Sequence, residues 1–170
     1  AVIEREFIGG VCLNVGCIPS KALIQAGHVY NQSKDPSAFG ITTQGVEIDW
    51  EKTQDWKDNV VVKQMTDGVE YSLKKNNVQI IEGEAYFNDE NTLRVTNGED
   101  AQTYTFKNAI VATGSRPIEI NGFKFGDRVI DSTGGLNLKE IPKDLVIIGG
   151  GVIGSELGAV YANLGTKVTI

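Results

Sequence analysis

The sequence has few of the side chains that build disulfide frameworks and metal sites. It contains two cysteines, Cys12 and Cys17, and one histidine, His28, in 170 residues. A structural disulfide framework needs several bridges. Structural zinc needs four ligands, and at most three soft ligands are present here, so we expect no metal site. We expect His28 to pack on a helix face rather than to act as a ligand or a base.

Long apolar runs and an excess of positive charge are also missing. No run approaches the roughly 20 apolar residues that span a bilayer, and no signal peptide is visible. The net charge is −6, so we expect neither nucleic acid nor a membrane as a partner. Low cysteine use fits a reducing cytoplasm, which is the location that we expect. The 20 glycines, 4 prolines and 41% hydrophobic content fit an α/β nucleotide-binding chain.

Both cysteines lie in one glycine-flanked stretch, GGVCLNVGCIPSK at residues 9–21. In a straight α-helix, residues five apart are about 8.6 Å apart by Cα, whereas a disulfide tolerates roughly 7 Å. A regular helix therefore cannot bridge Cys12 and Cys17. A distorted turn at Asn14 and Gly16 that leads into a helix over residues 20–30 can do so. The pattern favours a redox-active pair, and inert buried thiols or a metal site remain as alternatives.

The C-terminal part carries a dinucleotide-binding pattern. The apolar stretch 145–148 is expected to be a buried strand, and it precedes a Gly-x-Gly-x-x-Gly turn and a predicted helix. Gly149 permits the tight turn, Gly151 lets a pyrophosphate approach the backbone, and Gly154 lets the helix pack on the strand. The helix N-terminus supplies N–H groups and a positive dipole end for the anion. A second strand is expected at 167–170, before the acid that would distinguish NAD from NADP.

The patterns between these two motifs predict a loop, a long helix and several strands. Residues 31–45 are polar and predict a loop. Apolar residues recur at helical spacing from Asp49, a possible N-cap, to Lys75, and this stripe is expected to be core packing. An antiparallel meander is expected from strands at 78–81, 84–87, 92–96 and 102–106.

Two further stretches connect the meander to the dinucleotide-binding pattern. Residues 108–117 predict a buried strand that runs into a turn of small residues at 112–114, where backbone can approach a ligand closely. Residues 129–142 are typical of a crossover between domains. The middle of the chain is therefore expected to link two nucleotide-binding units.

The stretch 9–21 resembles the active-site segment of the flavin-dependent pyridine nucleotide–disulfide oxidoreductases. The resemblance is closest to the branch that oxidises dihydrolipoamide, because Ile-Pro-Ser-Lys at 18–21 points away from glutathione reductase and, less strongly, from mercuric reductase. It covers essentially the whole chain. It implies an α/β fold: an incomplete FAD-binding Rossmann-type domain with an antiparallel β-meander over 1–142, followed by the first βαβ unit of an NAD(P)-binding Rossmann domain over 143–170.

The resemblance also assigns roles to individual residues. Cys12 would exchange with the substrate and Cys17 would lie against the flavin. Lys21 would lie near flavin N5 and pair with Glu156, and Glu4 would bind the adenosine ribose of FAD. Its other implied cofactor-binding residues are Gly10, Val11, Glu84, Ala85, Ala112, Thr113 and Gly114 for FAD, and Gly149, Gly151 and Gly154 for the nicotinamide nucleotide. A solvated strand-end acid, a solvated lysine and an ordinary first-turn acid remain the plain alternatives for Glu4, Lys21 and Glu156.

The function that the resemblance implies is oxidation of protein-bound dihydrolipoamide with NAD, through the cysteine pair and FAD. The implied partners are the lipoyl domains of 2-oxo acid dehydrogenase complexes and a second copy of the full-length subunit in a homodimer. We expect the 170-residue chain by itself to be inactive, because the family's first FAD phosphate loop and its catalytic His and Glu are not in it. The alternatives are a non-catalytic truncated dinucleotide-binding or scaffold product, and a related family member such as mercuric reductase.

Overall fold

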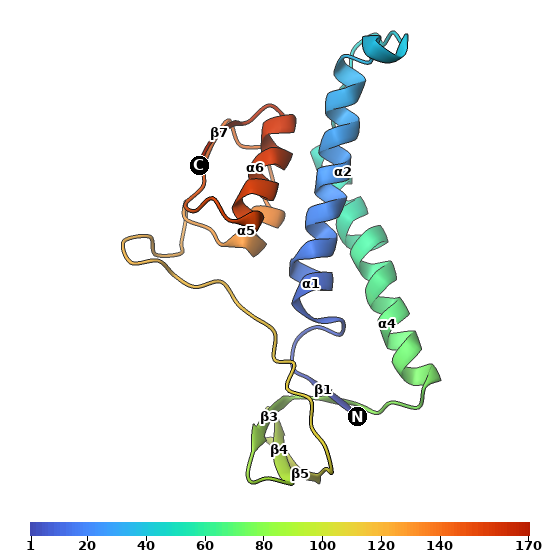
Figure 1. Cartoon of the computed structure of the whole chain (residues 1–170), viewed down its shortest axis with the longest axis vertical. Coiled ribbons are helices and arrows are strands. Elements are labelled where there is room, and N and C mark those ends of the chain that lie inside the picture. Colours follow the sequence, from blue (N-terminus) through green and yellow to red (C-terminus); the bar gives the residue numbers. More distant parts are fainter.

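The computed structural model describes residues 1–170 and confirms the α/β class (Figure 1). The helices are α1 (Gly10–Val15), α2 (Cys17–Lys34), the short 3-10 helix η1 (Ser37–Phe39), α3 (Trp50–Asp55), the π-helix η2 (Trp56–Val62), α4 (Lys63–Lys75), α5 (Ser132–Leu136) and α6 (Val152–Asn163). The strands are β1 (Val2–Glu4), β2 (Ile80–Glu82), β3 (Glu84–Phe87), β4 (Thr92–Asn97), β5 (Asp100–Thr105), β6 (Asp144–Val146) and β7 (Lys167–Thr169). No helix combines the length and the apolar character that crossing a bilayer requires.

Helix α2 is longer than the sequence predicts, since it continues to Lys34 where a loop from residue 31 was expected. The residues at its end are polar but compatible with a helix. The helix ends at Asp35, whose φ of −138° and ψ of 78° are not helical. Asp35 precedes Pro36, and the residue before a proline is sterically disfavoured in the helical region. The proline, rather than polarity, therefore sets the end of this helix.

The long helix predicted from Asp49 is confirmed as the continuous path α3, η2 and α4. The Asp49 carboxylate accepts a hydrogen bond from the Lys52 N–H at 3.1 Å, which caps the helix start. The apolar stripe is only partly core: Trp50 is buried, but Val60 and Met65 are 49% and 48% exposed. The π-helical turns of η2 add residues per turn, so side chains beyond it no longer follow the spacing of 3.6 that the prediction used.

The sheets are small and are made from strands that the sequence located well. Strands β3, β4 and β5 form an antiparallel sheet, whereas β2 pairs in parallel with β1. The expected four-strand meander is therefore wrong in its first strand. Gly83 separates β2 from β3 with a φ of 145°, and a Cβ there would lie 2.6 Å from the Thr96 carbonyl oxygen. The chain turns away from the first sheet at this glycine.

The buried strand predicted over 108–117 is absent. Every residue from 107 to 128 is exposed, and Ile110 is 94% exposed. A strand needs a neighbour for its backbone hydrogen bonds, and the sheet of β1 and β2 has only these two strands. Figure 1 shows this segment as a long extended trace between β5 and α5. The turn at Ala112, Thr113 and Gly114 therefore does not follow a buried strand in this structure.

The core lies where α2, α5 and α6 meet. Its buried residues are Leu23, Trp50, Leu136, Leu157, Val160, Tyr161 and Leu164. The Tyr161 hydroxyl donates to the Gly135 carbonyl oxygen of α5, and burial raises the pKa of this phenol. Strands β6 and β7 pair in parallel beside α6, but Val146 and Ile148 are 68% and 51% exposed, so the expected burial of the strand at 145–148 is wrong. The core therefore joins the helix that carries Cys17 to the helix after the glycine turn.

Candidate functional site

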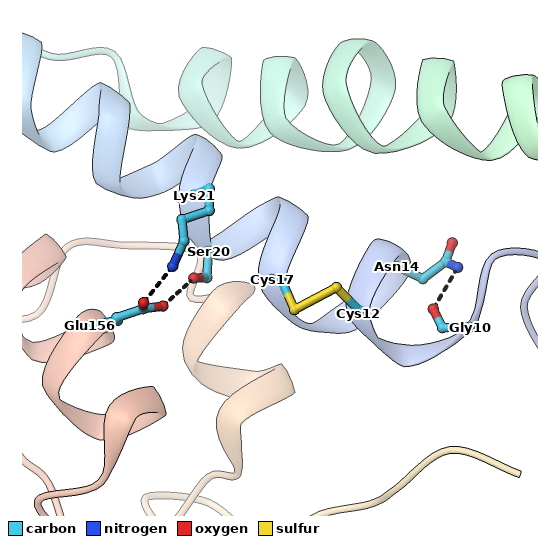
Figure 2. Close-up of a disulfide and its surroundings, with 7 residues drawn as sticks. All are labelled: Gly10, Cys12, Asn14, Cys17, Ser20, Lys21 and Glu156. Atoms are coloured by element: carbon cyan, nitrogen blue, oxygen red, sulfur yellow. Dashed lines mark hydrogen bonds and ion pairs between the residues drawn. A yellow bond between two sulfur atoms is a disulfide. The ribbon is translucent and has the colours of Figure 1, made fainter. Parts of the chain in front are cut away.

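A disulfide bonds Cys12 of α1 to Cys17 of α2 across the break between the two helices (Figure 2). The Cα atoms are 4.7 Å apart, within the range that a disulfide tolerates and shorter than a straight helix allows. The predicted helix break is confirmed. Helix α2 begins directly at Cys17, so the first turn of an 18-residue helix carries one sulfur of the bridge.

Gly16 makes the break possible. A Cβ at this position would lie 3.0 Å from the Val11 carbonyl oxygen and 3.1 Å from the Cα of Cys12. Both contacts are with backbone, which cannot swing aside as a flexible side chain can. A larger residue at this position would therefore force the backbone around Cys12 to shift by a few tenths of an ångström.

Asn14 holds the turn before the first cysteine. Its Nδ2 donates to the carbonyl oxygens of Ile8 and Gly10, each at 2.9 Å. Its Oδ1 accepts from the Thr66 hydroxyl of α4 at 3.2 Å. From the sequence we expected only that Asn14 tolerates unusual backbone angles. Its role as an anchor of the turn was missed. An amide between two cysteines, with a glycine four residues before it, was the available signal.

Lys21 and Glu156 form an ion pair between α2 and α6, although they are 135 residues apart in the sequence. The Ser20 hydroxyl donates to Oε2 of the same carboxylate at 2.8 Å. The Lys21 ammonium, and then the Ser20 hydroxyl, lower the pKa of Glu156, because both favour its charged form. Sequence reasoning singled out Lys21 and Glu156 but missed Ser20, which is 8% exposed.

The glycine turn lies before the helix that carries Glu156. Gly149 has a φ of 107°, which favours glycine, and Gly151 is the N-cap of α6 without a side-chain cap. A Cβ at Gly154 would lie 2.6 Å from the Gly149 carbonyl oxygen and 2.9 Å from Ile147 Cγ2. A Cβ at Gly151 would meet nothing within 4 Å. The turn therefore packs tightly on the strand side and is open at the helix N-terminus, the geometry that a pyrophosphate needs.

Near the N-terminus of the chain, Glu4 ends β1 and folds back on its own backbone. Its Oε1 accepts from the N–H groups of Arg5 and Glu6, each at 2.9 Å. Arg5 also donates to Glu84 at 2.6 Å, which ties β1 to β3. These contacts place Glu4 and Glu84 on neighbouring elements at one end of the molecule (Figure 1).

The extended segment 107–128 approaches α1, the helix that carries Cys12, at Gly114. A Cβ at Gly114, whose φ is 71°, would lie 3.2 Å from Val11 Cγ2. The structure therefore brings Gly114 beside Val11. Ala112 and Thr113 are exposed.

The family model of the pyridine nucleotide-disulphide oxidoreductases matches residues 1–170. The chain belongs to this family. It is 63% identical over 169 residues to dihydrolipoyl dehydrogenase of Geobacillus stearothermophilus and 59% identical to that of Bacillus subtilis. Each match covers 99% of this chain and 36% of the relative. The chain thus spans about a third of the length of these relatives.

Two solved structures have a similar fold. The chain superposes on the HOCl-induced flavoprotein disulfide reductase RclA from Escherichia coli with a TM-score of 0.74 and 32% identity, covering 99% of this chain and 35% of that one. It also matches LpdA from Mycobacterium tuberculosis with a TM-score of 0.89 and 21% identity, covering 98% and 37%. The second likeness shows the shared fold.

Both cysteines are exposed in this chain. The side chains of residues 1–170 therefore do not shield Cys17, which the resemblance places against the flavin. His28 is also exposed, so its expected packing role is wrong. It lies on the outer face of α2, between the buried positions Leu23 and Gly27 and the end of the helix.

Proposed function

We propose that the full-length protein to which this chain corresponds is a dihydrolipoyl dehydrogenase, which oxidises a protein-bound dihydrolipoyl group with NAD. The observation that carries the proposal is the Cys12–Cys17 disulfide at the helix break, with the Lys21–Glu156 pair one turn further along α2. The 63% and 59% identical relatives bear this name and support it. The reaction belongs to the whole subunit, of which this chain is about a third by comparison with its relatives.

The thiol–disulfide exchange needs only the substrate dithiol and the Cys12–Cys17 disulfide. A thiolate of the dihydrolipoyl dithiol attacks Cys12 Sγ, which forms a mixed disulfide and releases Cys17 as a thiolate. The second thiol of the substrate then attacks the substrate sulfur of the mixed disulfide and releases Cys12 as a thiolate. The substrate leaves as a cyclic disulfide that has lost two electrons and two protons, and the protein holds both electrons as a dithiol. Transfer of the pair to NAD restores the disulfide and yields NADH and a proton.

We assign FAD as the group that carries the electron pair between the dithiol and the nicotinamide, which is chemistry that side chains lack. The residues present fit such a group. Val11 and Gly114 lie together beside the disulfide, and a Cβ at Gly10, whose φ is 69°, would meet nothing within 4 Å. Glu4 ends a parallel strand, where a carboxylate can bond a ribose. Backbone at Glu84 and Ala85, in the strand tied to β1, would bind the adenine.

Three parts of this chain act on the reaction through position and charge. The N-terminus of α2 lies at Cys17, so the helix dipole favours the thiolate over the thiol at this sulfur. Lys21, paired with Glu156, keeps a positive charge one turn away. The open N-terminus of α6, at Gly149 and Gly151, would hold the pyrophosphate of NAD.

The remaining features of the proposal concern the whole protein. We assign residues 1–142 to the FAD-binding domain and 143–170 to the start of the NAD-binding domain. The partners would be lipoyl domains of 2-oxo acid dehydrogenase complexes and a second subunit, in the cytoplasm. The close packing of α2 on α6 means that the two domains are expected to move as one unit at this contact.

The test uses the full-length protein loaded with FAD. Dihydrolipoamide and NAD are expected to give NADH, with loss of turnover to background in Cys12→Ser and in Cys17→Ser. His28→Ala is the matched control, because His28 is exposed on the same helix, and it is expected to keep wild-type turnover. Turnover that survives both cysteine substitutions would contradict the proposed function.

A further inference from the structure

A hydrogen bond joins α2, the helix that begins at Cys17, to α6, the helix that follows the glycine turn. It lies beside the Lys21–Glu156 ion pair. Ser20 Oγ donates to Glu156 Oε2 at 2.8 Å, while Lys21 Nζ contacts Oε1. Two consecutive residues of α2 thus bond one carboxylate of α6, each at its own oxygen (Figure 2).

Lys21 and Ser20 differ in how far they can restrict the direction of the Glu156 carboxylate. The Lys21 side chain is 60% exposed, and its flexible stem can follow the carboxylate wherever it points. Exposed ion pairs between long side chains gain little and are screened by salt. Ser20 is 8% exposed and has a single side-chain torsion before its hydroxyl, so it loses little entropy when it bonds. Ser20 is therefore the member of the trio that can set the direction of the carboxylate.

The backbones beneath these side chains are already fixed. Seven residues beyond Ser20, a Cβ at Gly27 would lie 3.5 Å from Asn163 Cβ and 3.5 Å from the Val160 carbonyl oxygen. Asn163 is itself seven residues beyond Glu156, so the helices touch again about two turns along both of them. Because this contact holds the two helix axes, the Glu156 carboxylate can still move by rotation of its side chain.

We propose that Ser20 is a positioning residue, whose hydroxyl fixes the Glu156 carboxylate and thereby holds the Lys21 ammonium beside the redox disulfide. Cys17, Ser20 and Lys21 are spaced i, i+3 and i+4, which places them on one helix face. Lys21 therefore follows Cys17 by one helical turn, and its ammonium is directed to Glu156 (Figure 2). Without the hydroxyl, Oε2 loses its donor, the carboxylate can rotate, and Lys21 can bond either oxygen. The significance of this position for electron transfer rests on the proposed function, but the contact itself does not.

The test is a carbon-13 NMR titration of the Glu156 side-chain carboxyl in the full-length protein, with the signal assigned by its loss in Glu156→Gln. Ser20→Ala is expected to raise the titration midpoint, and Ser20→Thr, which restores a hydroxyl, is expected to bring it back. Ser72→Ala removes an exposed helix serine and is expected to leave the midpoint unchanged. A midpoint in Ser20→Ala equal to that of wild type would overturn the proposal.

A second measurement needs no variant and covers the case in which Ser20→Ala does not fold. In wild-type protein the Ser20 hydroxyl proton is expected to exchange slowly with water above the Glu156 midpoint and rapidly below it. Rapid exchange at both pH values would overturn the proposal. Neither readout depends on turnover, so a protein that fails to oxidise dihydrolipoamide would contradict the proposed function without touching this inference.

The loaded enzyme gives a third readout if the proposed function holds. In Ser20→Ala, reduction of the flavin by dihydrolipoamide is expected to slow about fivefold, the effect of one ordinary hydrogen bond. The KM for NAD is expected to stay unchanged, because the glycine turn is not altered. Recovery of the rate in Ser20→Thr would support the hydroxyl as the cause, and an equally slow Ser20→Thr that folds normally would contradict it.

Discussion

Thr66 of α4 donates its hydroxyl to Asn14, which lies between the two cysteines, at 3.2 Å. The same hydroxyl lies 3.0 Å from the Val62 carbonyl oxygen, so its one proton is shared between two acceptors. Through this contact the long helix supports the turn that carries Cys12. The redox disulfide is therefore held from both sides, by α4 at Asn14 and by α6 at Ser20.

The first prediction concerns this anchor. Asn14→Ala removes the donors to the Ile8 and Gly10 carbonyl oxygens and is expected to lower the free energy of unfolding by about 1–3 kcal/mol. The disulfide is also expected to react faster with a small thiol, because the turn before Cys12 is looser. Urea unfolding and the rate of reduction by dithiothreitol measure the two effects. Thr66→Val is the matched control, since it leaves both carbonyl bonds in place, and it is expected to have the smaller effect on each.

The second prediction concerns the glycine turn. Gly151→Val in the full-length protein is expected to weaken binding of the nicotinamide nucleotide and to leave reduction of the flavin by dihydrolipoamide largely intact, because a Cβ there would meet no atom of this chain within 4 Å and would obstruct only the open N-cap. Stopped-flow measurements separate the two half-reactions. Gly68→Ala in α4 serves as a distant glycine control, because Gly68 is exposed and a Cβ there would meet nothing within 4 Å. Loss of both half-reactions in Gly151→Val alone would mean that the turn has a structural role instead.

The third prediction separates the cysteines. In FAD-loaded full-length protein, Cys12→Ser is expected to leave a Cys17 thiolate that gives a long-wavelength charge-transfer absorption with the oxidised flavin, and Cys17→Ser is expected to abolish it. The reason is that Cys17 starts α2, where the helix N-terminus favours a thiolate. Both cysteines are exposed in this chain, so access alone does not decide their roles. The reverse pattern of absorption would exchange the two assignments.

The fourth prediction is a pH dependence of stability. The folded-state pKa of Glu156 is lowered, first by Lys21 and then by Ser20. A lowered carboxyl pKa contributes stability that is present above the ordinary value and is lost as the pH falls through the folded value. As the pH falls below about 5, the free energy of unfolding of wild type is therefore expected to decrease more than that of Glu156→Gln. Thermal unfolding at several pH values measures this, and parallel curves for the two proteins would contradict it.

The fifth prediction tests the core contact between α5 and α6. Tyr161→Phe removes the hydroxyl that donates to the Gly135 carbonyl oxygen and leaves that oxygen buried without this donor. The expected cost is about 1–3 kcal/mol of unfolding free energy. Tyr71→Phe is the matched control, because Tyr71 is 66% exposed, and it is expected to change stability by less than about 0.5 kcal/mol.

The sequence was most informative where local chemistry determines the structure. The spacing of Cys12 and Cys17 predicted a helix break because a straight helix is too long for the bridge, and the structure has that break at Gly16. Asp49 was identified as a helix cap because a carboxylate before an apolar-periodic stretch bonds the first N–H groups. These predictions depend on few residues, all close together in the chain.

The sequence was least informative where a structure depends on distant partners. The apolar residues near Ile110 read as a buried strand, but a strand forms only beside a neighbour, and residues 108–117 have none. The parallel pairing of β2 with β1 was missed because proximity to the next predicted strand favoured a hairpin. Ser20 carries no signal of its own, since a small polar residue in a helix is common. Its bond to Glu156 depends on the packing of α2 on α6, which spans 136 residues of sequence.

The most direct measurement of the central claim is alkylation of the cysteines in the FAD-loaded full-length protein, followed by mass spectrometry of the peptide that holds Cys12 and Cys17. Before reduction neither cysteine is expected to react. One equivalent of dihydrolipoamide without oxygen is expected to make Cys12 reactive, and NAD added afterwards is expected to protect it again while NADH appears. A Cys12 that stays unreactive after the dithiol, or that stays reactive after NAD, would contradict a redox-active disulfide at the start of α2.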